Sequence, residues 1–578
     1  MSNNTYIALT LGPIYRTLQT ARSTKELWAA SYLFSYITEK ITKKLREKGI
    51  KDAQFVMPYA PEIRNEKLSF GAGIFPDRII FKKTKTTDLQ TTTDAVDATL
   101  DKVSEIVKGT LVNKGLVGKD TDIESYIKAY FQIYVIEKEV SEGKNAILEI
   151  SPYLDTIELQ SHIVQTETEV ERPHKEDSKK TKKDKIERRN YLEMYFEHIN
   201  GSCLARKVFG DNSLNKGSFS HIDGFPSIPD IATIALYRQS PFDIKKEADD
   251  TQFYEQLRKC TVIEPLLNHY HRYICIVHAD GDNIGKAISH IKDNNFLPFS
   301  EKLYDFGFEA AKLIDNYGGK PVYIGGDDLL FFAPIQSNNG SIFTLIEQLN
   351  QKFNDLNFEV GKDDIKPTLS FGISISYFKF PMFETLEISR DLLFDKAKNY
   401  KAKSGDEKNA EALEISRDLL FDKAKNYKVK SGNEKNAIAF RVLKHSGQYW
   451  ETILQKDTLL YTQFIALLNN TSISDTALSS LTYQLNKSQP LLDEIWKNSN
   501  SLVWKTEADD TQNPFRHFFK NYFNEGIHQG DSKNYIDMVA RLLWLCYQQC
   551  DEAQANEVLY ALLRTLNFLS PKKTNINE

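Results

Sequence analysis

The chain has 578 residues, of which 26% are charged and 41% hydrophobic, and its formal net charge at pH 7 is −5. This is the balance of an ordinary soluble globular protein, and the net charge argues against a protein that coats nucleic acid along its whole surface. No apolar run approaches the roughly 20 residues that span a bilayer, and the start MSNNTYIALTLGP lacks the basic region and cleavage site of a secretory signal. We therefore expect a cytoplasmic protein of several domains, with no membrane partner.

The five cysteines do not indicate a disulfide framework or a metal site. Their number is odd, they are scattered, and no Cys-x-x-Cys pair occurs. Cys546 and Cys550 are four residues apart in a helical pattern, so they share one face and are expected in a core. A zinc site would need two further ligands nearby, and no zinc is expected.

Residues 1–92, or 1–150 with an extension, are expected to form a first domain. Its predicted elements are a strand at 5–11 that ends at Gly12-Pro13, helices at 15–21 and from Ser23 to Gly49, and strands at 53–61 and 78–83. Strand, helices, strand, strand is the order of a ferredoxin-like sandwich of sheet and helices. No acidic residue ends the first strand, where a metal ligand would be wanted, so the chemistry of this domain indicates a binding module.

Residues 93–240 are expected to form a helical and mixed linker domain, with helices at 93–116 and 121–141. Within it, the segment 165–189 is strongly polar, because nine Lys or Arg stand against four Asp or Glu from Arg172 to Arg189. A solvated, mobile surface loop is the simpler interpretation of this segment. A flexible basic arm near RNA is the alternative.

Residues 241–446 show the pattern β-α-α-β-β-α-β, again ferredoxin-like and typical of the palm of many nucleotide polymerases and cyclases. The predicted elements are a strand and helix over 273–288, a helix at 300–319, a hairpin at 321–334, a helix at 341–356, a strand at 368–378 and another helix. Helical patterns then dominate at 449–468, 474–486, 488–498, 512–525 and 533–568, so 447–578 is predicted to be a C-terminal helical bundle. The predicted fold class is α+β: two palm domains, helical linker regions and this bundle.

The hairpin PVYIGGDDLLFFAP at 321–334 joins two buried apolar runs by a glycine-led turn, with Asp327 and Asp328 at its tip. Carboxylates there are costly unless a cation compensates them, and the glycines allow a bulky ligand to approach the backbone. Asp280, in the Asp-Gly-Asp that ends the first strand of this palm, is predicted to lie beside the tip, since adjacent strands are about 4.8 Å apart. These three acids could then share two divalent ions roughly 3.5–4 Å apart, as a metal-bound polyphosphate requires.

An internal duplication follows the hairpin. Leu386–Ala412 and Leu413–Ala439 match at 24 of 27 positions, but only the second copy continues into an apolar strand at 437–443, because Glu411 in the first copy replaces Ile438. We infer that one copy completes the palm and the other is an inserted helix plus loop, and the sequence does not decide which. Two copies are too few for a solenoid, and a recent duplication, or an assembly artefact, explains them better than function does.

Four segments resemble the large subunit of type III CRISPR effector complexes, in its Cmr branch: residues 8–35, FPSIPDIAT at 225–233, HADGDNIGKAI and the GGDD hairpin. The resemblance covers most of residues 5–445. It implies two palms with the second one active, and a C-terminal bundle packed against the small subunits of the complex. It also implies that target RNA, paired to a guide RNA, turns on synthesis of an adenylate second messenger from ATP.

Residue by residue, the resemblance assigns Asp327 and Asp328 to the two GGDD acids and Asp280 to the acid that ends the first palm strand. The nucleotide-binding candidates are Gly325, Gly326, Gly281, Asp282, Lys286 and, in the helix pattern D-K-A-K, Lys398 or Lys425. The role of Asp282 as a ligand stays open, because it could point to the same side as Asp280 or into the turn. Two departures matter: no His-Asp dipeptide occurs, so no HD nuclease activity is expected, and at most Cys203 remains of the zinc-binding cysteine cluster of the family.

The expected function is nucleotidyl transfer from ATP with two Mg²⁺ or Mn²⁺ ions. The usual product in the family is cyclic oligoadenylate, some members of this branch join AMP to S-adenosylmethionine, and the motif does not specify the acceptor. The alternatives are a catalytically inactive scaffold for guide RNA and partner subunits, or a merely acidic hairpin tip. A diguanylate cyclase usually has Glu-Phe after the glycines and a sensor domain, and a template-dependent polymerase needs thumb and fingers elements; none of these is found.

Overall fold

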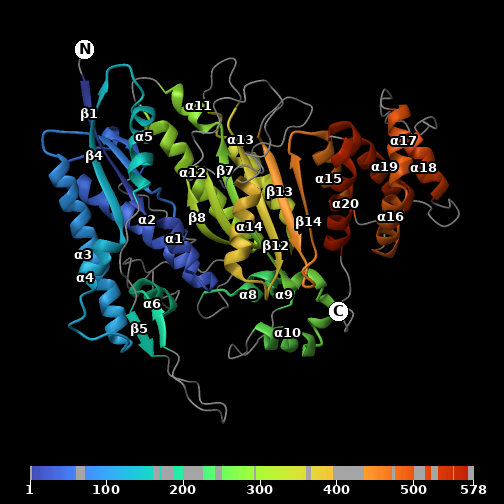
Figure 1. Cartoon of the computed structure of the whole chain (residues 1–578), viewed down its shortest axis with the longest axis horizontal. Coiled ribbons are helices and arrows are strands. Elements are labelled where there is room, and N and C mark those ends of the chain that lie inside the picture. Colours follow the sequence, from blue (N-terminus) through green and yellow to red (C-terminus); the bar gives the residue numbers. More distant parts are fainter. Residues whose placement is uncertain are drawn as a thin grey trace, which may run out of the picture.

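The computed structural model of the chain describes residues 3–59, 72–160, 168–171, 186–198, 225–240, 250–291, 295–358, 366–394, 435–470, 475–499, 514–522, 531–550 and 552–570. The molecule is elongated, with the first palm at the blue end of Figure 1, the second palm in the middle and the C-terminal helices at the red end. The predicted α+β class, with two palms and a C-terminal bundle, is confirmed. None of the described helices is both long enough and apolar enough to cross a bilayer.

The first palm is a four-stranded antiparallel sheet in the order β2-β3-β1-β4. Its elements are β1 (Asn3–Gly12), α1 (Ile14–Gln19), α2 (Thr24–Glu47), the 3-10 turn η1 (Asp52–Gln54), β2 (Phe55–Met57), β3 (Arg78–Lys82), α3 (Leu89–Asn113), α4 (Ile123–Tyr130), β4 (Gln132–Ser141) and α5 (Ala146–Glu158). Helix α2 begins at the predicted capping box, where the Ser23 hydroxyl accepts a hydrogen bond from the Glu26 amide.

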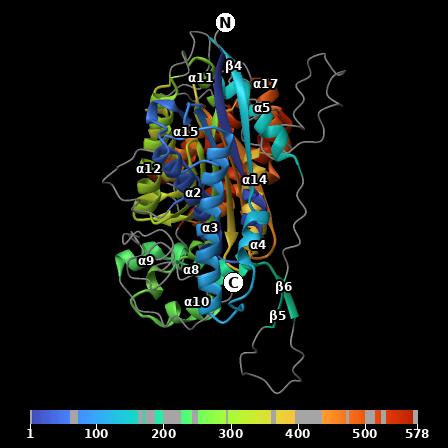
Figure 2. The same ribbon diagram turned by 90° about the vertical axis from the view of Figure 1, so that its left-hand side faces the viewer.

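Strand β4 corrects the prediction that residues 121–141 are helical. Helix α4 ends at Tyr130, and β4 then pairs with the whole of β1, from Gln132 opposite Gly12 to Ser141 opposite Asn3. The run IYVIEKEV is rich in β-branched residues, and pairing along a full-length partner strand outweighs a weak helical preference. Figure 2 looks onto this side of the molecule and shows β4 beside α5. The first sheet is therefore completed by residues well beyond 92.

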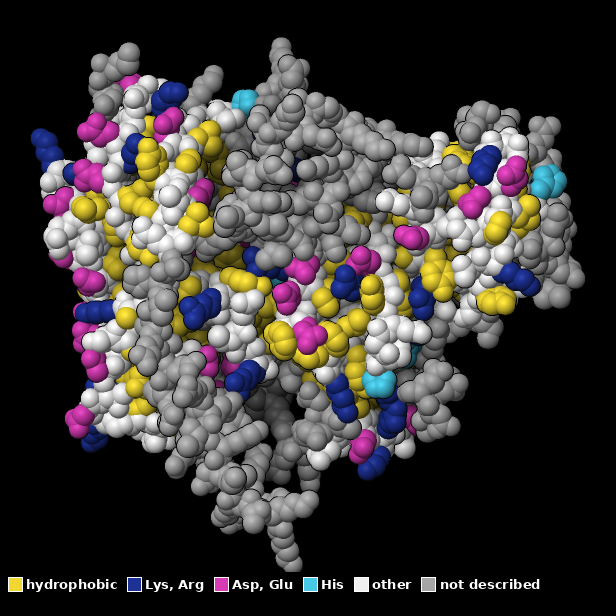
Figure 3. Space-filling model, in the orientation of Figure 1, with side chains coloured by type: hydrophobic (Ala, Val, Ile, Leu, Met, Phe, Trp, Pro, Cys, Tyr) yellow, Lys and Arg dark blue, Asp and Glu magenta, His cyan; other side chains and the backbone are white. Residues whose placement is uncertain are grey.

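Short elements connect the two palms. They are the antiparallel pair β5 (Thr168–Glu171) and β6 (Ile186–Arg189), then α6 (Tyr191–His198), α8 (Ile228–Ala232), α9 (Ile234–Gln239), α10 (Asp250–Lys259), η4 (Glu264–Leu266) and η5 (His269–Arg272). Apart from β5 and β6, the basic segment 165–189 lies outside the described residues. On the face shown in Figure 3, the described Lys and Arg side chains are interspersed with Asp and Glu and do not gather in one patch.

The second palm is a six-stranded sheet in the order β14-β13-β12-β7-β9-β8, antiparallel except for the parallel pair β12 and β13. Its elements are β7 (Tyr273–Asp282), α11 (Ile284–Ser289), α12 (Leu297–Tyr317), β8 (Lys320–Gly325), β9 (Asp328–Pro334), the small hairpin β10 (Gln336–Ser337) and β11 (Gly340–Ser341), α13 (Ile342–Asn354), β12 (Thr368–Tyr377), α14 (Met382–Phe394), β13 (Ala437–Leu443) and β14 (Tyr449–Gln455). Strands β7 and β12 are buried along most of their length, so both faces of each strand are covered. β7 is therefore largely apolar, whereas β12 alternates apolar residues with the small buried residues Ser370, Ser374 and Ser376.

The two copies of the duplication contribute different parts of this palm. Helix α14 ends with the start of the first copy, and its Leu392 and Leu393 pack against Ala437 and Ala439 of β13. Strand β13 itself follows from the second copy. Residues 395–434, which hold the rest of both copies, lie outside the described residues.

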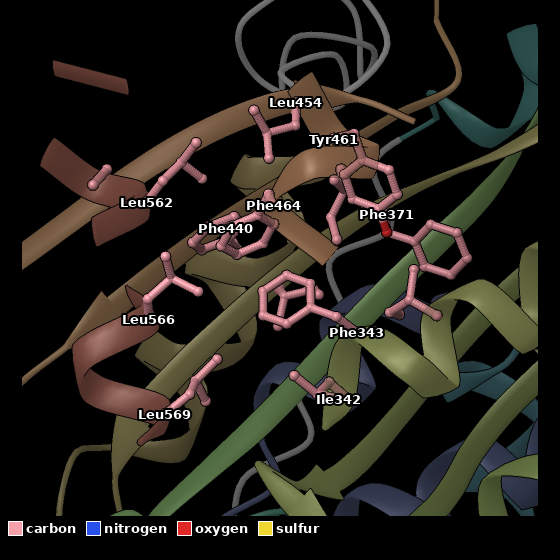
Figure 4. Close-up of a cluster of buried hydrophobic side chains, with 14 of the residues drawn as sticks. Ile342, Phe343, Phe371, Phe440, Leu454, Tyr461, Phe464, Leu562, Leu566 and Leu569 are labelled. Atoms are coloured by element: carbon pink, nitrogen blue, oxygen red, sulfur yellow. The ribbon is translucent and has the colours of Figure 1, made fainter. Parts of the chain in front are cut away.

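The C-terminal part contains α15 (Leu459–Leu468), α16 (Asp475–Lys487), α17 (Gln489–Ser499), α18 (Pro514–Tyr522), α19 (Asp531–Gln549) and α20 (Glu552–Leu569). The prediction that a helix begins at residue 449 is wrong, because residues 449–455 form β14, which pairs with β13 along its length. Trp450 on β14 donates a hydrogen bond to the Thr565 hydroxyl on α20, at 2.9 Å. The sheet and the helices therefore share one core, in which Phe343, Phe440 and Phe464 meet (Figure 4).

Replacing Phe464 by alanine should destabilise this shared core. Phe464 is fully buried and contacts the rings of Phe343 and Phe440, and truncating a buried Phe typically costs about 3–5 kcal/mol. We expect a clear fall in the midpoint of thermal unfolding. Tyr483→Ala, at a position 65% exposed on α16, is the matched control and should have little effect. Equal midpoints for the two variants would contradict a common core.

Candidate active site at the end of the second palm

The predicted hairpin is formed by β8 and β9, whose last pair is Gly325 opposite Asp328. Gly326 and Asp327 make the turn, and Gly326 has a φ of 78°. A positive φ at the first central position is the requirement of a type II′ hairpin turn, and glycine meets it without strain. The turn thus fixes the two aspartates at the end of the sheet.

Asp327 lies directly over the backbone of β7. A Cβ atom placed on Gly281 would be 2.5 Å from Oδ2 of Asp327 and 2.6 Å from its Cβ, closer than real Cβ atoms approach other atoms. Only a glycine at position 281 therefore allows the Asp327 carboxylate to occupy this place. We expected Gly281 to contact nucleotide. In the structure, the side chain of Asp327 packs against the Gly281 backbone.

Asp280 and Asp328 lie at the same end of the sheet as Asp327. The last pair between β7 and β9 is Ala279 opposite Leu329, and Asp280 and Asp328 are the next residue on each strand. Asp280 and Asp327 are half-buried, whereas the Asp328 side chain is exposed. The structure thus brings the three predicted acids to one end of the sheet, on strands about 4.8 Å apart.

Asp282 has a different place from the one expected of a nucleotide-binding residue. It is fully buried, and its Oδ2 accepts hydrogen bonds from the hydroxyls of Ser370 at 2.6 Å and Thr368 at 3.0 Å and from the amide of Asn436 at 3.0 Å. Burial raises the pKa of Asp282, and these hydrogen bonds together with the charge of Lys456 act in the opposite direction. Asp282 therefore ties β7 to β12 and to the start of β13.

This bracing role predicts the effect of substitution at position 282. Asp282→Ala leaves three donors without their acceptor, so we expect a loss of about 1–3 kcal/mol or more and a lower unfolding midpoint. Asp282→Asn keeps an acceptor oxygen and should lose much less. A residue that contacts nucleotide would show the reverse pattern, with normal unfolding of Asp282→Ala and weakened nucleotide binding.

The predicted lysines are not all placed. Lys286 is exposed on α11, the short helix that follows β7. Lys398 and Lys425 lie outside the described residues. Lys286 is therefore the one predicted lysine that the structure places near the acids, four positions after Asp282 in the chain.

Three residues at this end of the sheet were not singled out from the sequence. The ring of Tyr323 lies across Gly325, and its hydroxyl is near the carboxylates of Asp77, Asp328 and Asp327; burial, then these charges, raises its pKa. His278 on β7 is held by a hydrogen bond between Nδ1 and the Ser389 hydroxyl, at 2.8 Å. Strand alternation could have shown that His278 shares a face with Asp280. No pattern in the surrounding sequence predicts that Asp77 lies near these acids, because Asp77 belongs to the first palm and the acids belong to the second.

Asp327 and Asp328 are adjacent carboxylates, and ionising both of them is unfavourable unless a bound cation compensates their charge. Burial, followed by the charge of Asp328, raises the pKa of Asp327. Partial desolvation also raises the pKa of Asp328, although this residue stays accessible to solvent. Within the described part of the chain, no three His, Cys, Asp or Glu side chains are arranged as a ready metal cage. Carboxylate donors nevertheless fit Mg²⁺, which commonly binds through one or two carboxylates and completes its shell with substrate phosphates.

Two families match the chain. Residues 6–108 match the family described as "CRISPR-associated protein Cmr2, N-terminal". Residues 273–412 match "Cas10/Cmr2, second palm domain", and this range includes Asp280, Asp327 and Asp328. The two matches thus fall on the two palms described above.

A relative and two solved structures extend this comparison. The CRISPR system Cmr subunit Cmr2 of Pyrococcus furiosus is 26% identical over 185 residues, which cover 28% of this chain and only 21% of that protein. The apo state of type III-B Cmr-beta aligns with a TM-score of 0.55 and 12% identity, over 85% of this chain and 75% of that one. Type III-B Cmr-beta bound to cognate target RNA gives 0.50 and 11%, over 85% and 76%. At these identities, the structural likeness shows a shared fold.

Proposed function

The chain carries the Cas10/Cmr2 second palm domain and the Cmr2 N-terminal domain, and from this we propose that it is the nucleotidyltransferase subunit of a type III CRISPR effector complex of the Cmr branch. In this proposal, target RNA paired to the guide RNA activates synthesis of an adenylate second messenger from ATP. Other Cmr-type subunits and the two RNAs are the partners. The observation that supports the proposal is the packing of the Asp327 side chain on the Gly281 backbone, which brings it beside Asp280, the preceding residue of β7.

In this proposal, the acids bind the metal ions, and the glycine turn and Lys286 bind the triphosphate. Asp280 and Asp327, with Asp328 beside them, would hold two Mg²⁺ or Mn²⁺ ions, which lower the pKa of an attacking hydroxyl and stabilise the leaving pyrophosphate. The Gly325-Gly326 turn leaves room for the triphosphate to approach the backbone, and exposed Lys286 is a candidate partner of its phosphates. Positioning and charge neutralisation supply most of the acceleration in phosphoryl transfer, so no further acid or base is needed.

The acceptor is the open part of the proposal. A ribose hydroxyl of a second ATP would give cyclic oligoadenylate, whereas S-adenosylmethionine would give its conjugate with AMP. Mass spectrometry of products from the assembled complex with target RNA, ATP and Mg²⁺, with and without S-adenosylmethionine, distinguishes the two. Cyclic oligomers whose yield does not respond to S-adenosylmethionine would exclude the conjugate.

A scaffold without catalysis is the second candidate. It is favoured by one observation: within the described part of the chain, no three His, Cys, Asp or Glu side chains are arranged to hold a metal ion. A scaffold would give no nucleotide product under any of these conditions. Substituting both hairpin aspartates would then leave every output of the complex unchanged.

A further inference from the structure

The chain that leaves the acidic end of β7 packs on the first palm before it returns to the second. Helix α11 follows β7 directly, and Ile288 in its last turn and Ile291 beyond it pack against a cluster formed by the first sheet and α5. Phe296, the residue before α12, is fully buried in the same cluster, which includes Ile80 on β3 and Ile150 on α5. Figure 1 shows α11 near α5 at the top of the molecule. The first palm therefore holds this connection at two points.

Asn145 links α11 to the first palm by a hydrogen bond. It is the N-cap residue of α5, and its Oδ1 accepts hydrogen bonds from the amides of Ile147 at 3.1 Å and Leu148 at 3.3 Å. Its Nδ2 donates to the carbonyl of Ile288 on α11, at 2.7 Å. Because the cap fixes the oxygen, the nitrogen of the same planar amide is aimed at α11. An aspartate or a serine would also cap α5, so it is the bond to Ile288 that uses the amide nitrogen.

Helix α11 also touches the place where Asp327 lies. Ile284, its first residue, has Cγ1 2.7 Å from the point where a Cβ on Gly281 would lie, and the Asp327 side chain lies against the same point. Ala287 is buried in the core of the second palm, whereas Lys286 is exposed. A displacement of α11 would therefore move Ile284 relative to Asp327 and would move Lys286 at the same time.

The hairpin side of the acids is held by the first palm as well. The Ile324 amide on β8 donates to the Gly73 carbonyl at 2.8 Å, and the Ser31 hydroxyl on α2 donates to the Val322 carbonyl at 3.0 Å. Strand β8 leads into the turn that carries Asp327. The first palm thus contacts both segments that adjoin the acids, β8 before the hairpin turn and α11 after the end of β7.

We propose that Asn145 is a positioning residue for the catalytic end of the second palm. It holds α11 through the Ile288 carbonyl, so that Ile284 and Lys286 keep their places relative to Asp327. The inference rests on the proposed function, because the position of α11 affects a reaction only if Asp327 and Lys286 act on ATP. It gives the first palm, which has no metal ligand on its first strand, a part in catalysis that needs no contact with substrate.

The test uses variants that keep the cap and lose the donor. In the assembled complex with target RNA, Asn145→Asp should lower kcat for pyrophosphate release from ATP by about 10- to 100-fold. A carboxylate opposite the Ile288 carbonyl repels α11, and a displacement of about 1 Å at a catalytic group can cost on the order of 10²-fold in rate. The KM for ATP should change much less, since no group that binds the nucleotide is removed. Asn145→Ser is too short to reach Ile288 and adds no charge, so it should show a smaller loss in the same direction.

Hydrogen exchange locates the effect without relying on activity. In Asn145→Asp, the backbone amides of residues 284–291 should exchange about 5-fold faster than in the wild type, as for the loss of one hydrogen bond. The amides of α5 should keep their protection, because the cap remains, and the unfolding midpoint should fall little. Asn145→Ala, which removes the cap as well, should speed exchange in both segments.

Asp122→Asn is the matched control. It makes the reverse exchange of side chains at the N-cap of α4, where the exposed Asp122 accepts a hydrogen bond from the Ser125 amide at 3.0 Å. It should leave kcat and the exchange of α11 unchanged. A wild-type kcat for Asn145→Asp, or exchange of α11 at the wild-type rate, would overturn the positioning role and leave the proposed function intact. No pyrophosphate release from the wild-type complex would overturn the proposed function and, with it, the positioning role.

Discussion

Replacing Asp327 by asparagine in the assembled, target-bound complex should lower pyrophosphate release from ATP by about 10²–10³-fold or more. Asparagine keeps the size of the side chain over Gly281 but removes the charge that would hold the metal, and losing one group that stabilises transition-state charge has effects of this size. The measurement is the initial rate with Mg²⁺, together with the unfolding midpoint, which should not fall.

The matched control is Asp120→Asn, at an exposed position in the turn between α3 and α4 of the first palm. It should release pyrophosphate at the wild-type rate. A normal rate for Asp327→Asn as well would exclude nucleotidyl transfer at this hairpin and favour the scaffold.

Gly281→Ala should also nearly abolish activity, although it adds only a methyl group far smaller than the substrate. The new Cβ would lie 2.5 Å from Oδ2 of Asp327 and 2.7 Å from the Ile284 side chain, so at least one of them must move. A displacement of about 1 Å at a catalytic group can cost on the order of 10²-fold in rate, and overpacking typically costs about 1–3 kcal/mol of stability. Pyrophosphate release and thermal unfolding measure the two effects.

Gly285→Ala is the control for this substitution. It is four residues further on, in α11, and a Cβ there would meet nothing within 4 Å. Alanine is preferred to glycine in a helix, so this variant should be as stable as the wild type or slightly more so. If Gly281→Ala keeps full activity, the position of Asp327 over β7 is not the catalytic one.

The sequence predicted the second palm best where an apolar strand pattern is followed directly by acidic residues. Strand β7 and the hairpin are nearly unbroken apolar runs that end in glycine and aspartate, so their type, order and adjacency could be predicted. The same reasoning brought Asp280 to Asp327 and Asp328. The same reasoning did not decide the role of Asp282. Alternation along a strand predicts which face a side chain is on, but it does not identify hydrogen-bond donors such as Ser370 and Asn436, which are far away in the chain.

The errors have a common physical cause. The local pattern predicts helix where β4 and β14 lie, since each strand gains its identity from a partner, β1 or β13, that a local window does not contain. Asp77 was missed for a related reason. It reaches the site only because the first palm docks on β8, and nothing in the residues around it signals that contact.

The continuity of β13, β14 and α20 has a practical consequence for anyone who wishes to dissect this chain. A chain cut at residue 446 would lose β14 and leave one edge of β13 unpaired, with Phe343 and Phe440 stripped of Phe464. Exposed strand edges of this kind promote aggregation. The C-terminal helices therefore cannot be exchanged between homologues as an independent cassette, and a hybrid chain should take β13, β14 and α20 from the same parent.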